Sequence, residues 1–335
     1  MGNPVLVEVM RGALVESTHQ GSVAVIDAEG RSVLALGDVA RPVFPRSAVK
    51  ALQALVLFEA GAADRYGLTQ EELALACASH GGEPGHVATA TRMLERAGLD
   101  AGALECGAHW PIHQPSAQAL ARGGGAASAL HNNCSGKHAG FVCAACAMGV
   151  DHHGYVRPEH PVQRAVKATI ESLTGAGLAE DRCAVDGCSV PTWAIPLADL
   201  ALAFARFGTG RALAPERAKA AARLRAACAA HPWHVAGSGR FCTDVMQRFG
   251  SRVFVKTGAE GVYCGALPEE GLGFAVKCDD GATRAAEVAT AALIARFLTS
   301  SDSALERFVR PTLRNWNGIA VGQLRPTELL LPARP

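Results

Sequence analysis

The period of the hydrophobic residues changes twice along this chain, and this change constrains the fold more than any other feature. Near the N-terminus, apolar residues alternate with a period of two, as at Val5, Val7 and Val9, which is typical of strands. The same period returns late in the chain, over residues 252–256, 261–264 and 272–276. The sequence therefore predicts strands at both ends of the chain.

Helical spacing fills the region between these strands. Leu52, Leu55 and Val56 follow i, i+3, i+4 spacing, and Gly61 ends that run. Further helices are predicted over residues 69–78, 84–97, 136–148, 160–173, 196–207 and 214–229, and a closing helix over 283–298.

Because strands flank the helices, we expect an α/β (α+β) fold in which both chain ends share one antiparallel sheet. The chain is expected to form a single domain over residues 1–335. Its sheet lobe would comprise about 1–45 and 250–335, and its helical lobe about 46–249.

The charge balance argues against several classes of partner. The chain has 32 basic and 31 acidic residues and a net charge of +1, so it offers no attraction to nucleic acid or to an anionic membrane. The longest apolar runs fall short of the ~20 residues that span a bilayer. The N-terminus also lacks the basic and apolar regions of a signal peptide. We therefore predict a cytoplasmic protein that acts on a small molecule.

The eleven cysteines are an odd number scattered over a long chain, which in a reducing compartment predicts free thiols or metal ligands rather than disulfides. Cys143 and Cys146 form a Cys-x-x-Cys motif, but no second pair completes a zinc tetrad, so core packing is their expected use. His109 and His113 lie four residues apart, yet the intervening Pro111 argues against one helical ligand face.

A Ser-x-x-Lys motif, Ser47 to Lys50, lies where a helix is expected to begin. The spacing would bring the hydroxyl and the amine to one helix face. Serine is a poor nucleophile until a base takes its proton, and a neutral lysine amine can be that base. The alternative is an N-cap serine followed by a solvated lysine.

A Lys-Thr-Gly motif, Lys256 to Gly258, follows a predicted strand and supports the same chemistry. Penicillin-recognising serine enzymes carry such a motif on the strand beside their nucleophile, where glycine lets the substrate approach the backbone. The alternative is an ordinary boundary between a strand and a turn.

Three further segments are rich in polar and nucleophilic groups. Ser79-His80-Gly81-Gly82 ends a helix in a turn expected to expose Ser79, although it could be a simple C-cap. The segment from His131 to His138 could donate hydrogen bonds to an amide or bind a metal, or could be a capping loop. Asp186-Gly187-Cys188 could supply a carboxylate and a thiolate, or could be a turn.

Taken together, these five motifs, of which the first extends over Phe44–Lys50 and the last over Lys256–Gly261, resemble the thermolabile, rhizobial-type (class 3) L-asparaginases. The resemblance extends to the tail Leu313-Arg314-Asn315-Trp316-Asn317-Gly318. It implies a fold like that of serine β-lactamases and glutaminases, a homodimer, and hydrolysis of L-asparagine. It also implies two serine–lysine pairs, Ser47 with Lys50 and Ser79 with Lys256, without deciding which serine attacks.

The resemblance further implies a zinc ion (Zn2+) held by Cys134, Lys137 and Cys188. Lysine is an uncommon zinc ligand because its amine must be neutral. An arginine fork suits the carboxylate of an amino acid. The predicted substrate-binding residues are Arg46, His80, Asn133, His138, Asp186 and Glu260.

Three alternatives remain open at this stage: a glutaminase, a penicillin-directed enzyme, and a non-catalytic regulator that binds zinc or an amino acid. No Ser-Asp-Asn motif occurs between Ser47 and Lys256, which weakens the penicillin-directed alternative.

Overall fold

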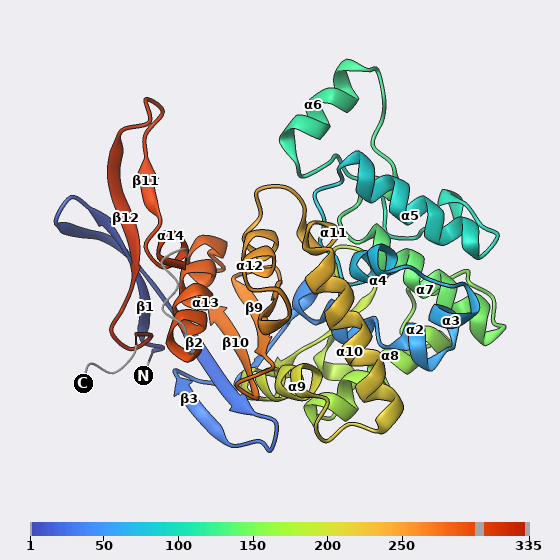
Figure 1. Ribbon diagram of the computed structural model, residues 1–335, viewed down its shortest axis with the longest axis horizontal. Coiled ribbons are helices and arrows are strands. Elements are labelled where there is room, and N and C mark those ends of the chain that lie inside the picture. The colour runs from blue at the N-terminus through green and yellow to red at the C-terminus, as the bar shows by residue number, and fades with distance from the viewer. Residues whose placement is uncertain (1, 299–304, 332–335) are drawn as a thin grey trace. The chain divides into compact units, whose positions relative to one another are not determined.

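The computed structural model describes residues 2–298 and 305–331, which divide into two compact units (Figure 1). The first comprises Met1–Ala48, Ile195–Thr209 and Lys256–Pro335. The second comprises Val49–Ala194 and Gly210–Val255. The described helices are not long and apolar enough to cross a membrane.

The first unit is built on an eight-stranded sheet with the order β11-β12-β1-β2-β10-β9-β8, and β3 pairs with β2. The recorded pairs of β1 with β12 and β2, and of β2 with β10, are antiparallel. The strands are β1 (Val5–Arg11), β2 (Leu14–Asp27), β3 (Ser32–Leu36), β8 (Phe254–Thr257), β9 (Val262–Leu267), β10 (Leu272–Cys278), β11 (Thr312–Arg314) and β12 (Ala320–Pro326). The predicted antiparallel sheet made from both chain ends is confirmed.

Two helices of the first unit, α9 (Leu197–Thr209) and α13 (Thr283–Phe297), pack against this sheet. Strand β9 is buried along its whole length, which requires cover on both faces. At Gly273 in β10, an added Cβ would lie 2.1 Å from the backbone nitrogen of Ala205, so only glycine lets α9 approach this closely. The sequence placed residues 196–207 with the helical lobe, whereas α9 belongs to the unit that holds the sheet.

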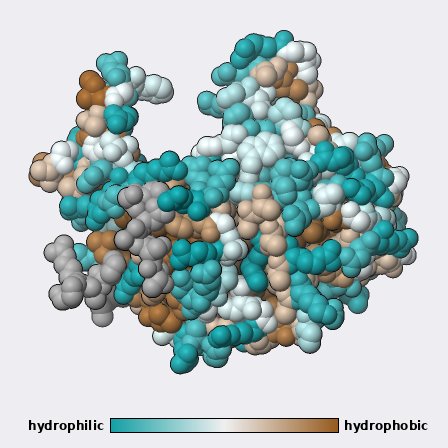
Figure 2. All heavy atoms as spheres, viewed as in Figure 1, coloured by the Kyte–Doolittle hydropathy of each residue, from teal (hydrophilic) through white to brown (hydrophobic). Residues whose placement is uncertain are grey.

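The remaining elements of the first unit are short. Helix α14 (Glu306–Val309) precedes β11, and β4 (Pro42–Val43) pairs with β7 (Ile195–Pro196). The β11–β12 hairpin extends beyond α13 (Figure 1), and hydrophobic residues lie among hydrophilic ones at its exposed end (Figure 2). Trp316 and Ile319 are the large apolar residues exposed in this turn.

The second unit is mainly helical, with one small hairpin of β5 (Cys183–Val185) and β6 (Pro191–Trp193). Its helices are α1 (Lys50–Gln53), α2 (Val56–Glu59), α3 (Ala62–Arg65), α4 (Gln70–Ala76), α5 (Pro84–Arg96), α6 (Gln114–Arg122), α7 (Ser135–Met148), α8 (Pro161–Thr174), α10 (Pro215–Ala230), α11 (Pro232–Ala236) and α12 (Phe241–Phe249). The predicted helices at 69–78, 84–97, 136–148, 160–173 and 214–229 are thereby confirmed within a few residues. The helix expected around Leu52, Leu55 and Val56, before Gly61, is instead split into α1 and α2.

Helix α7 lies at the centre of the second unit and is buried from Ser135 to Ala145. It contacts α2, α3, α4, α5 and α8. A helix that is apolar on all sides is stable only when it is buried on all sides. Small residues permit this burial, because an added Cβ at Gly136 would lie 2.3 Å from the carbonyl oxygen of Leu75. The N-terminus of α7 carries the cysteine and lysine of the candidate site.

Candidate active site

The buried amine of Lys50 is the centre of the candidate site. Its Nζ lies 2.6 Å from the carbonyl oxygen of Ala78, 3.0 Å from Ser79 Oγ and 3.0 Å from Cys134 Sγ. The residue is 1% exposed. An ammonium has three N–H donors, which these three acceptors satisfy, whereas a neutral amine could accept the Ser79 proton instead. The same contacts therefore suit both protonation states that a general base must adopt.

Ser79 is held rigidly at the end of α4. Its backbone N–H donates to the carbonyl of Val235 at 2.9 Å, and the next N–H, of His80, donates to the carbonyl of Asn133 at 3.2 Å. The expectation that this turn exposes Ser79 is wrong, because the residue is only 4% exposed. Hydrogen bonds to distant segments hold the turn inside the unit, and a local C-cap pattern gives no sign of them.

Cys134 immediately precedes α7, and its thiol is unusually acidic. Its backbone N–H donates to Asn132 Oδ1 at 2.9 Å, which fixes the turn. A hydrogen bond from Cys188 and the charges of Lys50 and Lys137 lower the pKa of the Cys134 thiol well below its ordinary value, against the effect of burial. The N-terminus of a helix also favours negative charge. With both lysines charged, Cys134 is therefore the more acidic thiol of this pair.

Lys137 and Cys188 complete this group, with Lys137 Nζ 3.0 Å from Cys188 Sγ. The pKa of the Cys188 thiol is raised, mainly by its hydrogen bond to Cys134 and secondly by burial. The first of the two thiols therefore loses its proton easily, and the second loses its proton with difficulty. Burial disfavours charge on Lys137, but the sulfurs of Cys188 and Cys134 outweigh this effect and raise its pKa.

The donors at Cys134, Lys137 and Cys188 fit the predicted zinc ion, because zinc accepts sulfur and nitrogen ligands and all three side chains are buried. The Sγ of Cys188 contacts both of the other groups. Among the described residues, three His, Cys, Asp or Glu ligand atoms lie within 4.8 Å of one another only at Asp151, His152 and His153. That surface group is not one that the sequence predicts as a metal site.

The backbone is strained at several predicted motifs. Four non-glycine residues of the described chain have a positive φ. Two of them lie in these motifs, Arg46 (51°) and Glu260 (54°), and a third, Ser189 (77°), directly follows Asp186-Gly187-Cys188. In the tight turn after β5, Asp186 accepts through its carbonyl from the N–H of Ser189 at 2.8 Å. Its Oδ1 accepts from the N–H of Gly187 at 2.7 Å. Such strain is common at functional sites.

His80 is buried with both ring nitrogens in hydrogen bonds. The N–H of Gly82 donates to Nδ1 at 3.1 Å, so Nε2 carries the proton and donates to Ser135 Oγ at 2.9 Å. Burial and the neighbouring His86 keep the pKa of His80 well below its ordinary value. These contacts suit a neutral ring that holds the N-terminus of α7, while its predicted substrate contact stays a prediction.

His138 has one ring nitrogen available for a ligand. The N–H of Glu105 donates to the hydroxyl of Tyr155 at 2.8 Å, and that hydroxyl donates to His138 Nδ1 at 2.7 Å. The proton of the neutral ring is therefore on Nε2, which is buried and has no hydrogen-bond partner among the described residues. Sequence reasoning missed Tyr155 and Glu105, because neither belongs to a motif.

The predicted site residues of the first unit form their own contacts. Lys256 is buried, and its Nζ donates to the carbonyl of Thr257 at 2.9 Å. An added Cβ at Gly258 would lie 2.6 Å from the carbonyl oxygen of Pro45, so the backbone approaches closely here. Ser47 lies half-buried in a 3-10 turn, Arg46–Val49. The carbonyl of Glu260 accepts from Lys277 Nζ at 2.8 Å.

The pairings of Ser47 with Lys50 and of Ser79 with Lys256 stay predictions. The substrate contacts expected of Arg46, Asn133, Asp186 and Glu260 also stay predictions.

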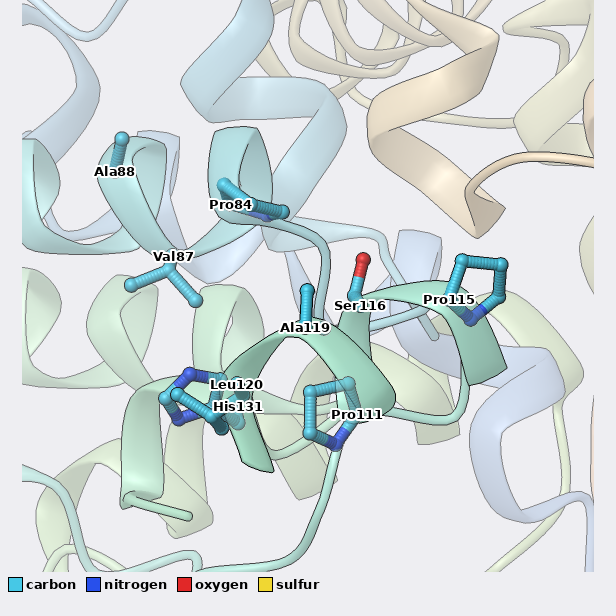
Figure 3. A pocket seen from close by; sticks show the side chains of 10 residues that line it. Pro84, Val87, Ala88, Pro111, Pro115, Ser116, Ala119, Leu120 and His131 are labelled. Atoms are coloured by element: carbon cyan, nitrogen blue, oxygen red, sulfur yellow. The ribbon is translucent and has the colours of Figure 1, made fainter. Parts of the chain in front are cut away.

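A separate cavity of about 490 Å³ lies between α5 and α6 (Figure 3). Its lining is mainly apolar, with Pro84 and Val87 from α5 and with Ala119 and Leu120 from α6. No predicted catalytic, metal-binding or substrate-binding residue is among the side chains that line it. The cavity is therefore distinct from the group around Lys50.

A buried amine against a hydroxyl is the kind of arrangement with which enzymes activate a nucleophile for hydrolysis. The L-asparaginase II family model matches residues 7–326. This chain belongs to the L-asparaginase II family, and it is an amidohydrolase.

Two solved structures are similar to this chain at low identity. One is a β-lactamase (Mb2281c) from Mycobacterium bovis, with 16% identity and a TM-score of 0.37 over 79% of this chain and 89% of that chain. The other is Mglu in its tris and glutamate form, with 17% identity and a TM-score of 0.37 over 90% of this chain and 65% of that chain. No curated protein matches.

Proposed function

We propose that this amidohydrolase is an L-asparaginase that converts L-asparagine to L-aspartate and ammonia through an acyl-enzyme on a serine. Membership of the L-asparaginase II family supports the substrate. The observation that carries the mechanism is the 3.0 Å contact between Lys50 Nζ and Ser79 Oγ inside a buried site. Lys50 is the general base in this proposal.

In the first step, neutral Lys50 takes the proton of Ser79 while Oγ attacks the side-chain amide carbon of asparagine. The resulting lysine ammonium then gives its proton to the leaving nitrogen, so that ammonia departs and a serine ester of aspartate remains. Water, deprotonated by the same amine, attacks the ester and releases aspartate. The bonds to Ala78 and Cys134 hold the amine in place during these transfers.

Ser47 is the second candidate nucleophile, because it lies three residues before the same lysine. Lys256 is proposed as a further amine of the site, which could shuttle protons or bind the substrate. Both roles rest on the family resemblance of their motifs. The contact that Ser79 makes with Lys50 favours Ser79.

We also propose that Cys134, Lys137 and Cys188 hold a zinc ion, which when bound would supply a Lewis acid beside the serine and lysine. Their burial and sulfur–nitrogen chemistry support this assignment. Because neighbouring sulfurs raise the pKa of Lys137, metal binding must displace a proton from it. Zinc affinity should therefore fall as the pH is lowered.

For substrate recognition, the buried Nε2–H of His138 supports a role as a hydrogen-bond donor to asparagine. Arg46 would pair with the α-carboxylate, and Asp186 or Glu260 would accept from the α-ammonium group. His80 and Asn133 would support these groups. A homodimer and a cytoplasmic location are proposed on the resemblance and on the sequence, respectively.

Ammonia release from purified protein tests this proposal. Asparagine should be hydrolysed, and Ser79→Ala should lose turnover by about 10³-fold or more, whereas Ser17→Ala, an exposed control on β2, should retain it. Ser47→Ala is measured in parallel. Full activity of both site variants would exclude the mechanism.

Three further outcomes separate the alternatives. Preference for glutamine would indicate a glutaminase. Covalent labelling by a penicillin would indicate a penicillin-directed enzyme, and binding of asparagine without ammonia release would indicate a non-catalytic protein.

A further inference from the structure

A surface segment of the second unit, residues 105–113, bonds to two segments of the candidate site, and we call it the 105–113 strap. Asn132 Nδ2 donates to the carbonyls of Cys106 and Gly107 at 2.9 and 3.0 Å. The N–H of His113 donates to the carbonyl of Gly81 at 2.9 Å. The strap thus holds both the turn before α7 and the turn that carries Ser79.

The imidazole of His109 makes the central contact of the strap. The backbone N–H of Asn133 donates to His109 Nε2 at 2.9 Å, so this nitrogen must present its lone pair. The proton then lies on Nδ1, which donates to the carbonyl of Trp110 at 2.7 Å. The Trp110 carbonyl therefore selects the tautomer that can hold Asn133.

Asn133 is the residue through which the strap can act on the site. The N–H of Asn133 donates to His109, and the carbonyl of Asn133 accepts from the N–H of His80. Its side-chain Oδ1 lies 3.2 Å from Cys134 Sγ. Cys134 in turn contacts Lys50 Nζ at 3.0 Å. A shift of the Asn133 peptide would therefore move Cys134 relative to the lysine.

We propose that His109 is a positioning residue for the reaction: by accepting the Asn133 N–H, it fixes Cys134 against Lys50. This inference rests on the proposed function. Cys106 and Pro111 of the strap are buried, whereas Trp110 and Ile112 are 48% and 49% exposed, so apolar packing anchors only part of it. Polar contacts such as the one from His109 hold the exposed part.

Two variants of His109 test the role. In His109→Gln the amide Oε1 can accept the Asn133 N–H near the place of Nε2, whereas His109→Leu has similar bulk and no acceptor. We expect His109→Leu to lower kcat by about 10–100-fold with little change in KM, as is found for residues that orient catalytic groups. His109→Gln should recover most of this loss. His153→Leu, at an exposed histidine, is the control.

Hydrogen exchange of the Asn133 amide gives a readout that does not depend on the chemistry. Exchange should accelerate in His109→Leu and stay near the wild-type rate in His109→Gln. If exchange changes in this way but the wild-type protein has no asparaginase activity, the proposed function and the catalytic part of the inference are refuted. The hydrogen bond from the Asn133 N–H to His109 would still be supported.

Equal kcat values in the two variants would overturn the inference. So would an equal fall in kcat and in melting temperature for both, because that result indicates a purely structural role. Unchanged exchange in His109→Leu would overturn the contact on which the inference depends.

Discussion

Helix α7 begins beside Cys134 and contains Cys143 in its middle, and the pKa values of these two thiols are shifted in opposite directions. Cys134 precedes the helix, where a hydrogen bond from Cys188 and two lysines lower its pKa. Cys143 lies in the middle of the helix, where burial raises its pKa to about 12. Both side chains are buried. Burial alone therefore does not decide whether a thiol ionises, because neighbouring donors and cations can reverse its effect.

The same comparison explains why we do not place the proposed chemistry at the Cys-x-x-Cys motif, Cys143 to Cys146. Cys143 donates to the carbonyl of Met93 at 3.3 Å, and burial also raises the pKa of Cys146. Neither thiol has a buried lysine beside it among the contacts described. The acidic thiol of this unit is the one at the start of α7, which Lys50 contacts and whose pKa the charges of Lys50 and Lys137 lower.

The largest expected effect comes from removing the amine that Cys134 and Ser79 share. Lys50→Met should lower kcat for asparagine by about 10³-fold, since general-base catalysis contributes roughly 10²–10⁴-fold. Lys219→Met, at a largely exposed lysine on α10, should leave kcat unchanged. Steady-state ammonia release measures both variants. A loss of less than tenfold in Lys50→Met would remove this lysine from the mechanism.

The next largest effect is a difference in zinc affinity between variants of Cys134 and of Cys143. Cys134→Ser should weaken zinc binding by about 10²-fold or more, because a thiolate ligand is lost. Cys143→Ser should bind zinc as the wild type does. Competition with a chromogenic chelator measures the affinities. Equal affinities in the two variants would show that Cys134 is not a ligand.

A third prediction concerns the buried ring of His86, whose neighbours do not offset the effect of burial on its pKa. Burial lowers the pKa of His86 to about 4, below the ~6.5 of an unfolded histidine. At a pH between these two pKa values, this histidine binds a proton in the unfolded chain but stays neutral in the folded protein. The stability contributed by the neutral ring is therefore complete above pH ~6.5 and lost as the pH falls to about 4.

Urea unfolding between pH 7 and 4 measures this effect. The free energy of unfolding should fall by about 2–3 kcal/mol from this histidine alone. His86→Asn keeps an acceptor for the Glu83 N–H that now donates to Nδ1, and its pH dependence should be flatter. Identical pH dependence in the wild type and the variant would refute the assignment.

The smallest effect concerns Cys143 as a packing residue. Cys143→Ala should lower the free energy of unfolding by about 1 kcal/mol, because it removes one buried sulfur and leaves a small cavity. It should leave kcat within twofold of the wild type. Urea unfolding and ammonia release measure the two quantities. A large loss of activity without a loss of stability would mean that the thiol in the middle of α7 has a chemical role.

The fold was largely predictable from sequence because its signals are local. Period-two alternation predicted β1, β8, β9 and β10 but not β11 and β12, and helical spacing predicted α4, α5, α7, α8 and α10. The single helix expected before Gly61 was wrong, since the helix is interrupted between α1 and α2. Hydrophobic spacing alone does not report such a break.

The candidate site was less predictable because its contacts join distant residues. The sequence paired Lys50 with Ser47, its neighbour in the chain, and that pairing stays a prediction. It did not predict the hydroxyl that does lie against the amine of Lys50, that of Ser79, 29 residues away. Spacing argued correctly that His109 and His113 share no helical face. It could not show that the His109 ring accepts from the Asn133 peptide, because that contact depends on the path of the 105–113 strap.

The most direct test of the account is to trap the acyl-enzyme. Wild-type protein mixed with asparagine is quenched in acid within milliseconds, and its peptides are mapped by mass spectrometry. The account predicts an aspartyl ester on the peptide that contains Ser79, absent from Lys50→Met. Rapid turnover with no ester on Ser79 or Ser47 would contradict the serine–lysine mechanism.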